Sequence, residues 1–215
     1  VCHAMEISIN EYLVSVYIWS VYTECLHGMP SKCPIRVAVP VNLRPYFNSI
    51  TTKNFFVMVS AEFHPTKETY TFAEVAEIVK ESLRSQINRE NLEKLFSYNV
   101  SNEKLLIARV VPLFLKNLAM KYVYTTSALA NTATITNIGN ISVTEEYRPY
   151  VEMFHAFLAM SKGQHLKGTI CSYGDTLVFS FSYDLVDASV QRGFFRKIAS
   201  DGIAVEIKSN GVNYE

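Results

Sequence analysis

The side chains that could move a proton near neutral pH are the five histidines of this chain, because an imidazole ring titrates in that range. His64 is the histidine with a carboxylate four residues later, at Glu68, but this pair falls in a turn expected between a strand and a helix. His155 lies in an apolar segment and His165 opens a hairpin strand, so we expect a structural role for each. The histidines therefore do not predict a catalytic base in this chain.

Other catalytic signatures are missing from the sequence. It contains no GxSxG nucleophile elbow, phosphate-binding loop, GxGxxG or HExxH, so the serine-hydrolase, nucleotide-binding and zinc-protease interpretations have no support. The neighbours Ser161 and Lys162 are a weak signal. A zinc site is not predicted, because no CxxC spacing occurs among the four cysteines, Cys2, Cys25, Cys33 and Cys171.

The composition is that of a chain with a real core. Apolar residues make up 49% of the 215 residues and charged residues 19%, which excludes a disordered class. Formal net charge is zero, so no bulk attraction for nucleic acid or an anionic membrane is expected. Aromatic residues reach 13%, which suits wide apolar faces or an apolar cleft.

Three features bear on location and completeness. The longest apolar run, Leu13 to Tyr22, is too short to span a bilayer. Four scattered thiols without a secretory signal indicate a reduced, cytoplasmic protein. Because the sequence starts at Val1 and not at Met, we expect it to be part of a longer protein.

Capping boxes and periodicity give the elements of the first half. Ser8 and Glu11 form a capping box that opens a helix to about Cys25, which ends near Gly28. A second box, Thr71 with Glu74, opens another helix. The strands expected here are Ile35–Val41 and Asn54–Phe63.

The second half is expected to carry more strands than helices. We predict a linker over Asn88–Tyr98, then a helical segment over Glu103–Tyr122 that Pro112 bends or divides. Asp187 is expected to cap a last helix that ends at about Ala199. The expected strands are Thr132–Ile138, Val151–Ala159, Leu166–Tyr173, Leu177–Tyr183 and Gly202–Ile207. This order predicts one α/β (α+β) domain over residues 1–215, with a mixed sheet flanked by helices.

Two motifs carry a resemblance to a known superfamily. The first is the strand and loop Ile35–Phe47, which reads IRVAVPVNLRPYF and is followed by Asn54-Phe55-Phe56. The second is Thr136-Asn137-Ile138-Gly139 at a strand end. Together they resemble the C-terminal half of the chloramphenicol-acetyltransferase-like superfamily. Its members include CoA-dependent acyltransferases, alcohol acetyltransferases and the condensation domains of peptide synthetases.

The resemblance implies half an enzyme. In the superfamily the base belongs to a motif of two adjacent histidines, three residues and an aspartate, in the N-terminal half. No histidine here has an aspartate four residues later, and the pair His64 and Glu68 lacks the first histidine and lies in the wrong half. We therefore expect no catalytic residue in this chain, and we expect the absent N-terminal half to be its partner.

The resemblance also implies site residues. Thr136, Asn137 and Gly139 would form a substrate-binding wall, where a hydroxyl and an amide donate to the oxyanion of acyl transfer. The alternative is a strand end whose Asn and Gly satisfy a turn. Asn42 and Arg44 would lie near the interface of the halves, where Arg44 could pair with a carboxylate, or they would only shape the exit from the sheet. Neither a metal nor a covalently bound cofactor is implied, and the co-substrate would be acyl-CoA or an acyl-carrier thioester.

Two functions follow as rivals. The chain is the tunnel-lining C-terminal half of an acyltransferase, inactive by itself, or it is a non-catalytic binding or docking module of the same shape. In the first case Thr136 and Asn137 should face an open cleft. An orphaned half should also expose a large apolar patch or bury it in a homodimer.

Overall fold

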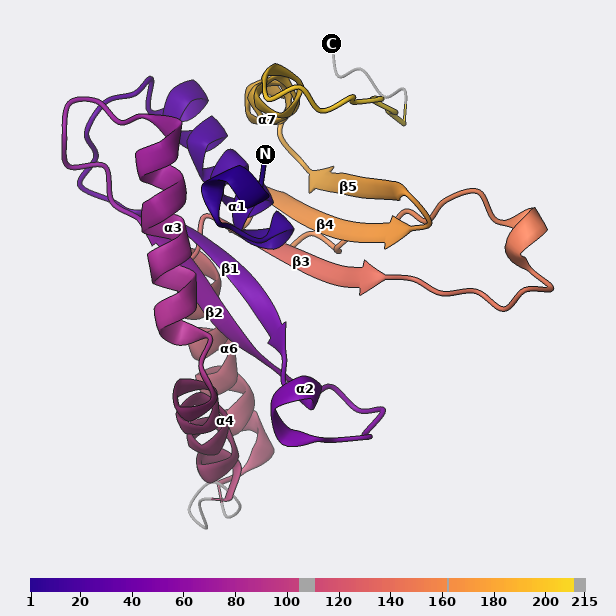
Figure 1. The fold of residues 1–215 in the computed structure, drawn as a ribbon. Helices are drawn as coiled ribbons and strands as arrows, with labels where there is room; N and C mark the ends of the chain where they lie inside the picture. Colours follow the sequence, from indigo (N-terminus) through magenta and orange to yellow (C-terminus); the bar gives the residue numbers. More distant parts are fainter. Residues whose placement is uncertain (105–110, 162, 211–215) are drawn as a thin grey trace.

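The computed structural model describes residues 1–104, 111–161 and 163–210, without the side chains of residues 99–104, 127 and 128. A five-stranded sheet runs through its centre in the order β2-β1-β3-β4-β5 (Figure 1). The strands are β1 (Ile35–Asn42), β2 (Phe56–Phe63), β3 (Ala133–Asn140), β4 (Leu166–Tyr173) and β5 (Thr176–Tyr183).

The sheet is mixed, as the sequence predicted. β3 runs parallel to both β1 and β4, whereas β2 and β5 add antiparallel to the two sides. The hairpin between β4 and β5 turns through Gly174, whose φ of 56° lies in the left-handed region. A tight turn joins β4 to β5, whereas residues 43–55, with the short helix α2 (Arg44–Phe47), join β1 to β2. The helices before β3 form the crossover that its parallel pairing with β1 needs.

Three helices cover one face of the sheet. They are α1 (Ile9–Ser20), α3 (Phe72–Gln86) and α7 (Ser189–Ser200). Their apolar side chains and the inward residues of the strands form one core, which includes Ile18, Val37, Ile135 and Phe194. Phe194 packs its ring against Phe179 with the centroids 4.4 Å apart, which joins α7 to the edge strand β5.

Both predicted capping boxes are confirmed. Glu11 accepts from the backbone N–H of Ser8 at 2.7 Å, and the Ser8 hydroxyl accepts from the backbone N–H of Glu11 at 3.2 Å. Thr71 and Glu74 make the same reciprocal pair at the start of α3. The first helix continues past α1 as a π-helical turn, Val21–Cys25. Such boxes satisfy backbone donors that would otherwise lack partners at a helix start.

The linker predicted over Asn88–Tyr98 is wrong. The helix α4 (Arg89–Lys104) occupies that stretch, and Asn88 Oδ1 accepts from the backbone N–H of Asn91 at 2.9 Å. Its polar composition hid the helix, but Asn88 supplies the cap that starts it. A further helix, α6 (Leu113–Leu129), begins directly after Pro112. Proline thus precedes the helix, where its missing N–H costs nothing. The predicted continuity across residues 105–110 lies outside the described residues.

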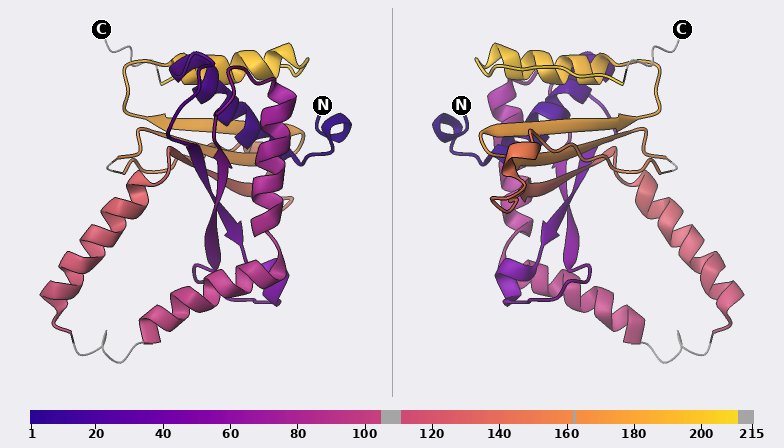
Figure 2. Two further views of the ribbon diagram at one scale, coloured as in Figure 1. Left: turned by 90° about the vertical axis from the view of Figure 1, so that its left-hand side faces the viewer. Right: turned by 90° about the vertical axis from the view of Figure 1, so that its right-hand side faces the viewer.

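Both α4 and α6 extend away from the rest of the molecule (Figure 2). On α6, each side chain that the structure describes is exposed except the half-buried Lys116. No helix among the described residues combines the length and the apolar character needed to cross a membrane.

Two of the predicted strands, Val151–Ala159 and Gly202–Ile207, are wrong. Residues 151–160 form an extended segment without strand pairing, and it is held by side chains of β4. The Cys171 thiol donates to Phe154 O at 3.2 Å, and Lys167 Nζ donates to Ala159 O at 2.8 Å. Residues 203–210 also form no strand, although Val205 packs against the core. In neither segment does the apolar pattern mark a hydrogen-bonded ladder, and Phe157 and Ile207 are 67% and 66% exposed.

Candidate functional site

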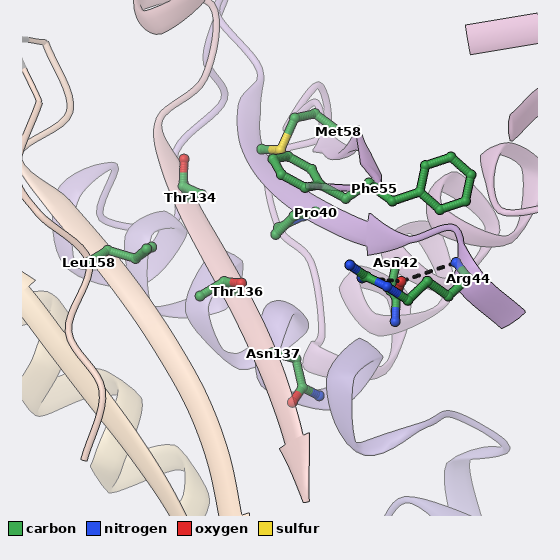
Figure 3. A pocket seen from close by; sticks show the side chains of 10 residues that line it. Pro40, Asn42, Arg44, Phe55, Met58, Thr134, Thr136, Asn137 and Leu158 are labelled. Carbon is green, nitrogen blue, oxygen red and sulfur yellow. Dashed lines mark hydrogen bonds between the residues drawn. The ribbon is translucent and has the colours of Figure 1, made fainter. Parts of the chain in front are cut away.

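An open cleft of about 440 Å³ lies on the sheet face opposite α1 and α3 (Figure 3). Side chains alternate between the two faces of a strand. Val39, Val59 and Ile135 therefore enter the core, while their neighbours face the cleft. The lining residues are Pro40, Asn42, Arg44, Phe55, Phe56, Met58, Thr134, Thr136, Asn137 and Leu158.

The strand β3 brings Thr136 and Asn137 to the cleft. Thr134 and Thr136 are half-buried and alternate with the buried residues Ala133 and Ile135, so their side chains lie on the cleft face. Asn137 also lines the cleft, although its pairing with the core residue Ile170 places it on the other face of the strand from Thr136. The substrate-binding role of Thr136 and Asn137 stays a prediction.

Asn137 also does what a turn requires. Its Oδ1 accepts from the backbone N–H of Gly139 at 2.8 Å, where the pairing of β3 with β4 shifts register. Gly139 has a φ of 86°, which a residue with a Cβ rarely adopts, and it does not line the cleft. The Asn137 oxygen is thus engaged in the turn, and its amide nitrogen is the group left to donate toward a ligand.

Asn42 and Arg44 approach the cleft from the end of β1. Arg44 Nε donates to Thr51 O at 2.9 Å and Nη2 donates to Lys53 O at 2.7 Å, while Nη1 donates to Asn42 Oδ1 at 3.2 Å. These bonds fold the following loop back onto β1, which is the structural role that the sequence allowed. A guanidinium has five N–H donors, so two of them stay available for an anion.

The cleft is apolar with a polar side. Phe55, Phe56 and Met58 supply apolar lining on one side and Leu158 on the other, with Thr134 and Thr136 of β3 between them (Figure 3). Arg44 is the one charged residue among those that line it, and none of them is a histidine. Such a surface can hold an apolar chain and donate hydrogen bonds to a carbonyl or an anion, but it offers no general base.

The histidines lie elsewhere. His64 Nε2 is 3.1 Å from Ser31 O, and His165 Nδ1 is 2.9 Å from Asp184 Oδ1. The ring of His155 stacks beside Phe157 with centroids 6.5 Å apart. All three are exposed, and none of them lines the cleft.

Sequence reasoning missed the apolar lining. Phe56 is 49% exposed and Met58 44% exposed, which is unusual for large apolar residues in a strand of a covered sheet. The alternation along β2 puts both on the face opposite Val57 and Val59. That pattern was readable in the sequence, but only the pairing of β1 with β2 shows that they meet Pro40 and Asn42 across the strands.

Comparisons with known proteins find likeness in structure only. No protein-family model and no curated protein sequence matches the chain. The epimerization domain from the third module of tyrocidine synthetase B is similar with a TM-score of 0.54 and 11% identity, over 93% of this chain and 43% of that one. The nonribosomal peptide synthetase FmoA3, bound to α-methyl-L-serine-AMP, gives a TM-score of 0.55 and 16% identity, over 93% of this chain and 20% of that one.

A third similar structure is the polyketide synthase associated protein 5 from Mycobacterium tuberculosis. Its TM-score is 0.52 at 10% identity, over 91% of this chain and 45% of that one. The chain thus spans less than half the length of each of these proteins. At such identities the likeness is one of fold.

Proposed function

We propose that the chain is the C-terminal subdomain of a thioester-dependent O- or N-acyltransferase, of the alcohol-acetyltransferase or condensation type. Its CoA-dependent acyltransferase-like fold and its match to less than half of each similar structure support this proposal. One observation carries this proposal. Thr136 and Asn137 of β3 line the same cleft as Asn42, at the end of β1, and Arg44, which follows it, although the two pairs are distant in sequence.

In this role the chain binds and orients, and the partner half supplies the base. The acceptor hydroxyl or amine loses its proton to that base and attacks the thioester carbonyl of acyl-CoA or of an acyl carrier. The Thr136 hydroxyl and the Asn137 amide would donate to the carbonyl oxygen as it becomes negative. Removing one such donor typically costs about 10²- to 10³-fold in kcat.

Turnover by the isolated chain tests the proposal. No lining residue serves as a base, and a general base typically contributes about 10²- to 10⁴-fold. We expect no transfer from acetyl-CoA to a panel of alcohols above background. Clear turnover by this chain alone would contradict the half-enzyme account.

The coding sequence upstream of Val1 gives a second test. A preceding segment on the scale of one domain, about 200 residues, with two adjacent histidines and an aspartate four residues after the second, supports the proposal. Co-expression of that segment should restore activity, and Thr136→Val should lower it. A start codon directly before Val1 favours the alternative.

That alternative is a non-catalytic docking module, favoured by α6. Its exposed apolar residues include Phe114, at 71% exposure, and Leu118, at 68%. Exposed apolar surface on this scale marks an interaction site. The partner is the N-terminal half in the first proposal, whereas in the second it is a second copy in a homodimer or another protein. In either case the four free thiols favour a cytoplasmic location.

A further inference from the structure

A lysine and a serine that the cleft does not use lie in contact on the same sheet face. Lys167 Nζ is 2.6 Å from Ser161 Oγ and 2.8 Å from Ala159 O. Lys167 is 8% exposed, whereas Ser161 is half-buried and so reachable from solvent. The buried amine therefore lies within hydrogen-bond distance of a hydroxyl that solvent can reach.

Both partners are fixed by regular hydrogen bonding. Lys167 lies in β4 between Thr134 of β3 and Ser182 of β5. The backbone of Ser161 forms an isolated bridge with Gln164, whose N–H donates to Ser161 O at 3.1 Å. Because the backbone holds both residues in place, the two side chains need no rearrangement to react with each other, as a catalytic pair requires.

The surroundings make the ammonium group of Lys167 easier to deprotonate than that of an exposed lysine. No carboxylate in the described ranges 1–104, 111–161 and 163–210 forms an ion pair with Lys167, and burial lowers the pKa of its ammonium group. On the same face, Thr169 Oγ1 is buried without a hydrogen-bond partner in the described part of the chain. The nearby titratable groups along β4 are the Cys171 thiol, bonded to a backbone carbonyl, and the exposed His165, paired with Asp184.

We propose that Ser161 and Lys167 form a nucleophile and base pair that accepts an acyl group from an activated ester or thioester. Once Lys167 has lost a proton to solvent, the Ser161 oxygen attacks the carbonyl carbon while its own proton passes to Nζ. The carbon–oxygen bond to Ser161 forms, the bond to the leaving alcohol or thiol breaks, and Lys167 returns the proton to that leaving group. None of the residues proposed to bind substrate in the acyltransferase takes part, so the two proposals stand or fall separately.

Acetylation by p-nitrophenyl acetate tests the pair in the chain as it is. We expect an early release of about one p-nitrophenolate per chain, at the rate at which Ser161 is acetylated with Lys167 as its base. Peptide mapping by mass spectrometry should find the acetyl group on Ser161. Acetyl groups on lysines and the N-terminus with none on Ser161 would overturn the proposal without any variant.

Variants separate a base from a structural anchor. Lys167→Arg keeps a cation that can bond to Ala159 O, but a guanidinium does not lose its proton, so Ser161 acetylation should be about a hundredfold slower or more. Ser161→Ala should abolish the burst, and Lys94→Gln on α4 is the control that leaves it unchanged. If a folded Lys167→Arg chain acetylates Ser161 at the wild-type rate, the lysine is only an anchor and the proposal fails.

Discussion

The helices α1 and α6 are alike in sequence and opposite in environment. Both carry apolar residues around much of their circumference and not along one stripe. In α1, nine of twelve residues are buried between the sheet, α3 and α7. In α6, the described side chains are almost all in solvent. A helix that is apolar all round belongs in a core, so the difference indicates that α1 finds its cover within the chain and α6 requires another surface.

The two sheet faces repeat this contrast. The face under α1, α3 and α7 is closed by a continuous core, whereas the other face holds the open cleft beside exposed Phe56 and Met58. The proposed half-enzyme would have one covered and one uncovered sheet face, as observed here. The following tests compare the covered and uncovered sides, from the largest expected effect to the smallest.

Truncation of one apolar side chain on each helix should give very different losses. Ile18 in α1 is fully buried and Leu118 in α6 is 68% exposed. Ile18→Ala should lower the free energy of unfolding by about 2–5 kcal/mol, because it removes core contacts and leaves a cavity. Leu118→Ala should change it by about 0.5 kcal/mol or less. Chemical denaturation measures both, and a loss at Leu118 as large as that at Ile18 would mean that α6 is already packed.

The second comparison is between the N-terminal caps of α1, which is covered by the rest of the chain, and α4, which is mostly exposed. Ser8→Ala removes the capping box of α1 and should cost about 1 kcal/mol of global stability. Asn88→Ala removes the cap of α4, on the arm that extends from the molecule. Among the described side chains of α4 only Leu92 is fully buried in the core, so the same substitution there should fray α4 and shift the global denaturation midpoint less than Ser8→Ala does. Circular dichroism would detect the fraying, and equal midpoint shifts for the two variants would remove the distinction.

The covered side should also show a small acid sensitivity. Burial of Glu11 raises the pKa of its carboxyl, but hydrogen bonds from Arg84 and Ser8 outweigh burial, so the net pKa is lowered. A lowered folded pKa means that the stabilisation is present above the unfolded value, about 4.3, and is lost as the pH falls below it. Glu11→Gln should therefore be less stable than the wild type at pH 7 and less sensitive to acid. A wild-type stability equal to that of the variant from pH 7 to pH 3 would show that the Arg84 contact contributes nothing.

Much of the fold was predictable because its signals are local. Capping boxes, the Gly174 turn and the β-branched strands depend on neighbours in sequence, and each was found. The helix α4 was missed because its first turn depends on Asn88 and not on an apolar stripe. The segment 151–160 was misread as a strand because its apolar residues resemble those of a strand, although it makes no strand pairing. In the cleft, the polar residues came from motif resemblance, while Phe56 and Met58 needed the strand register.

The central claim is that α6 is a contact surface that the chain itself does not cover. Sedimentation velocity over a concentration series tests it most directly, with a second copy as the partner at hand. The account predicts association that rises with concentration, and its loss in the double variant F114S/L118S with the fold unchanged. Ile50→Ser, at a side chain 99% exposed outside α6, is the matched control and should associate like the wild type. A wild-type chain that stays strictly monomeric, with α6 amides protected from hydrogen exchange, would mean that α6 is covered within the chain and would contradict the claim.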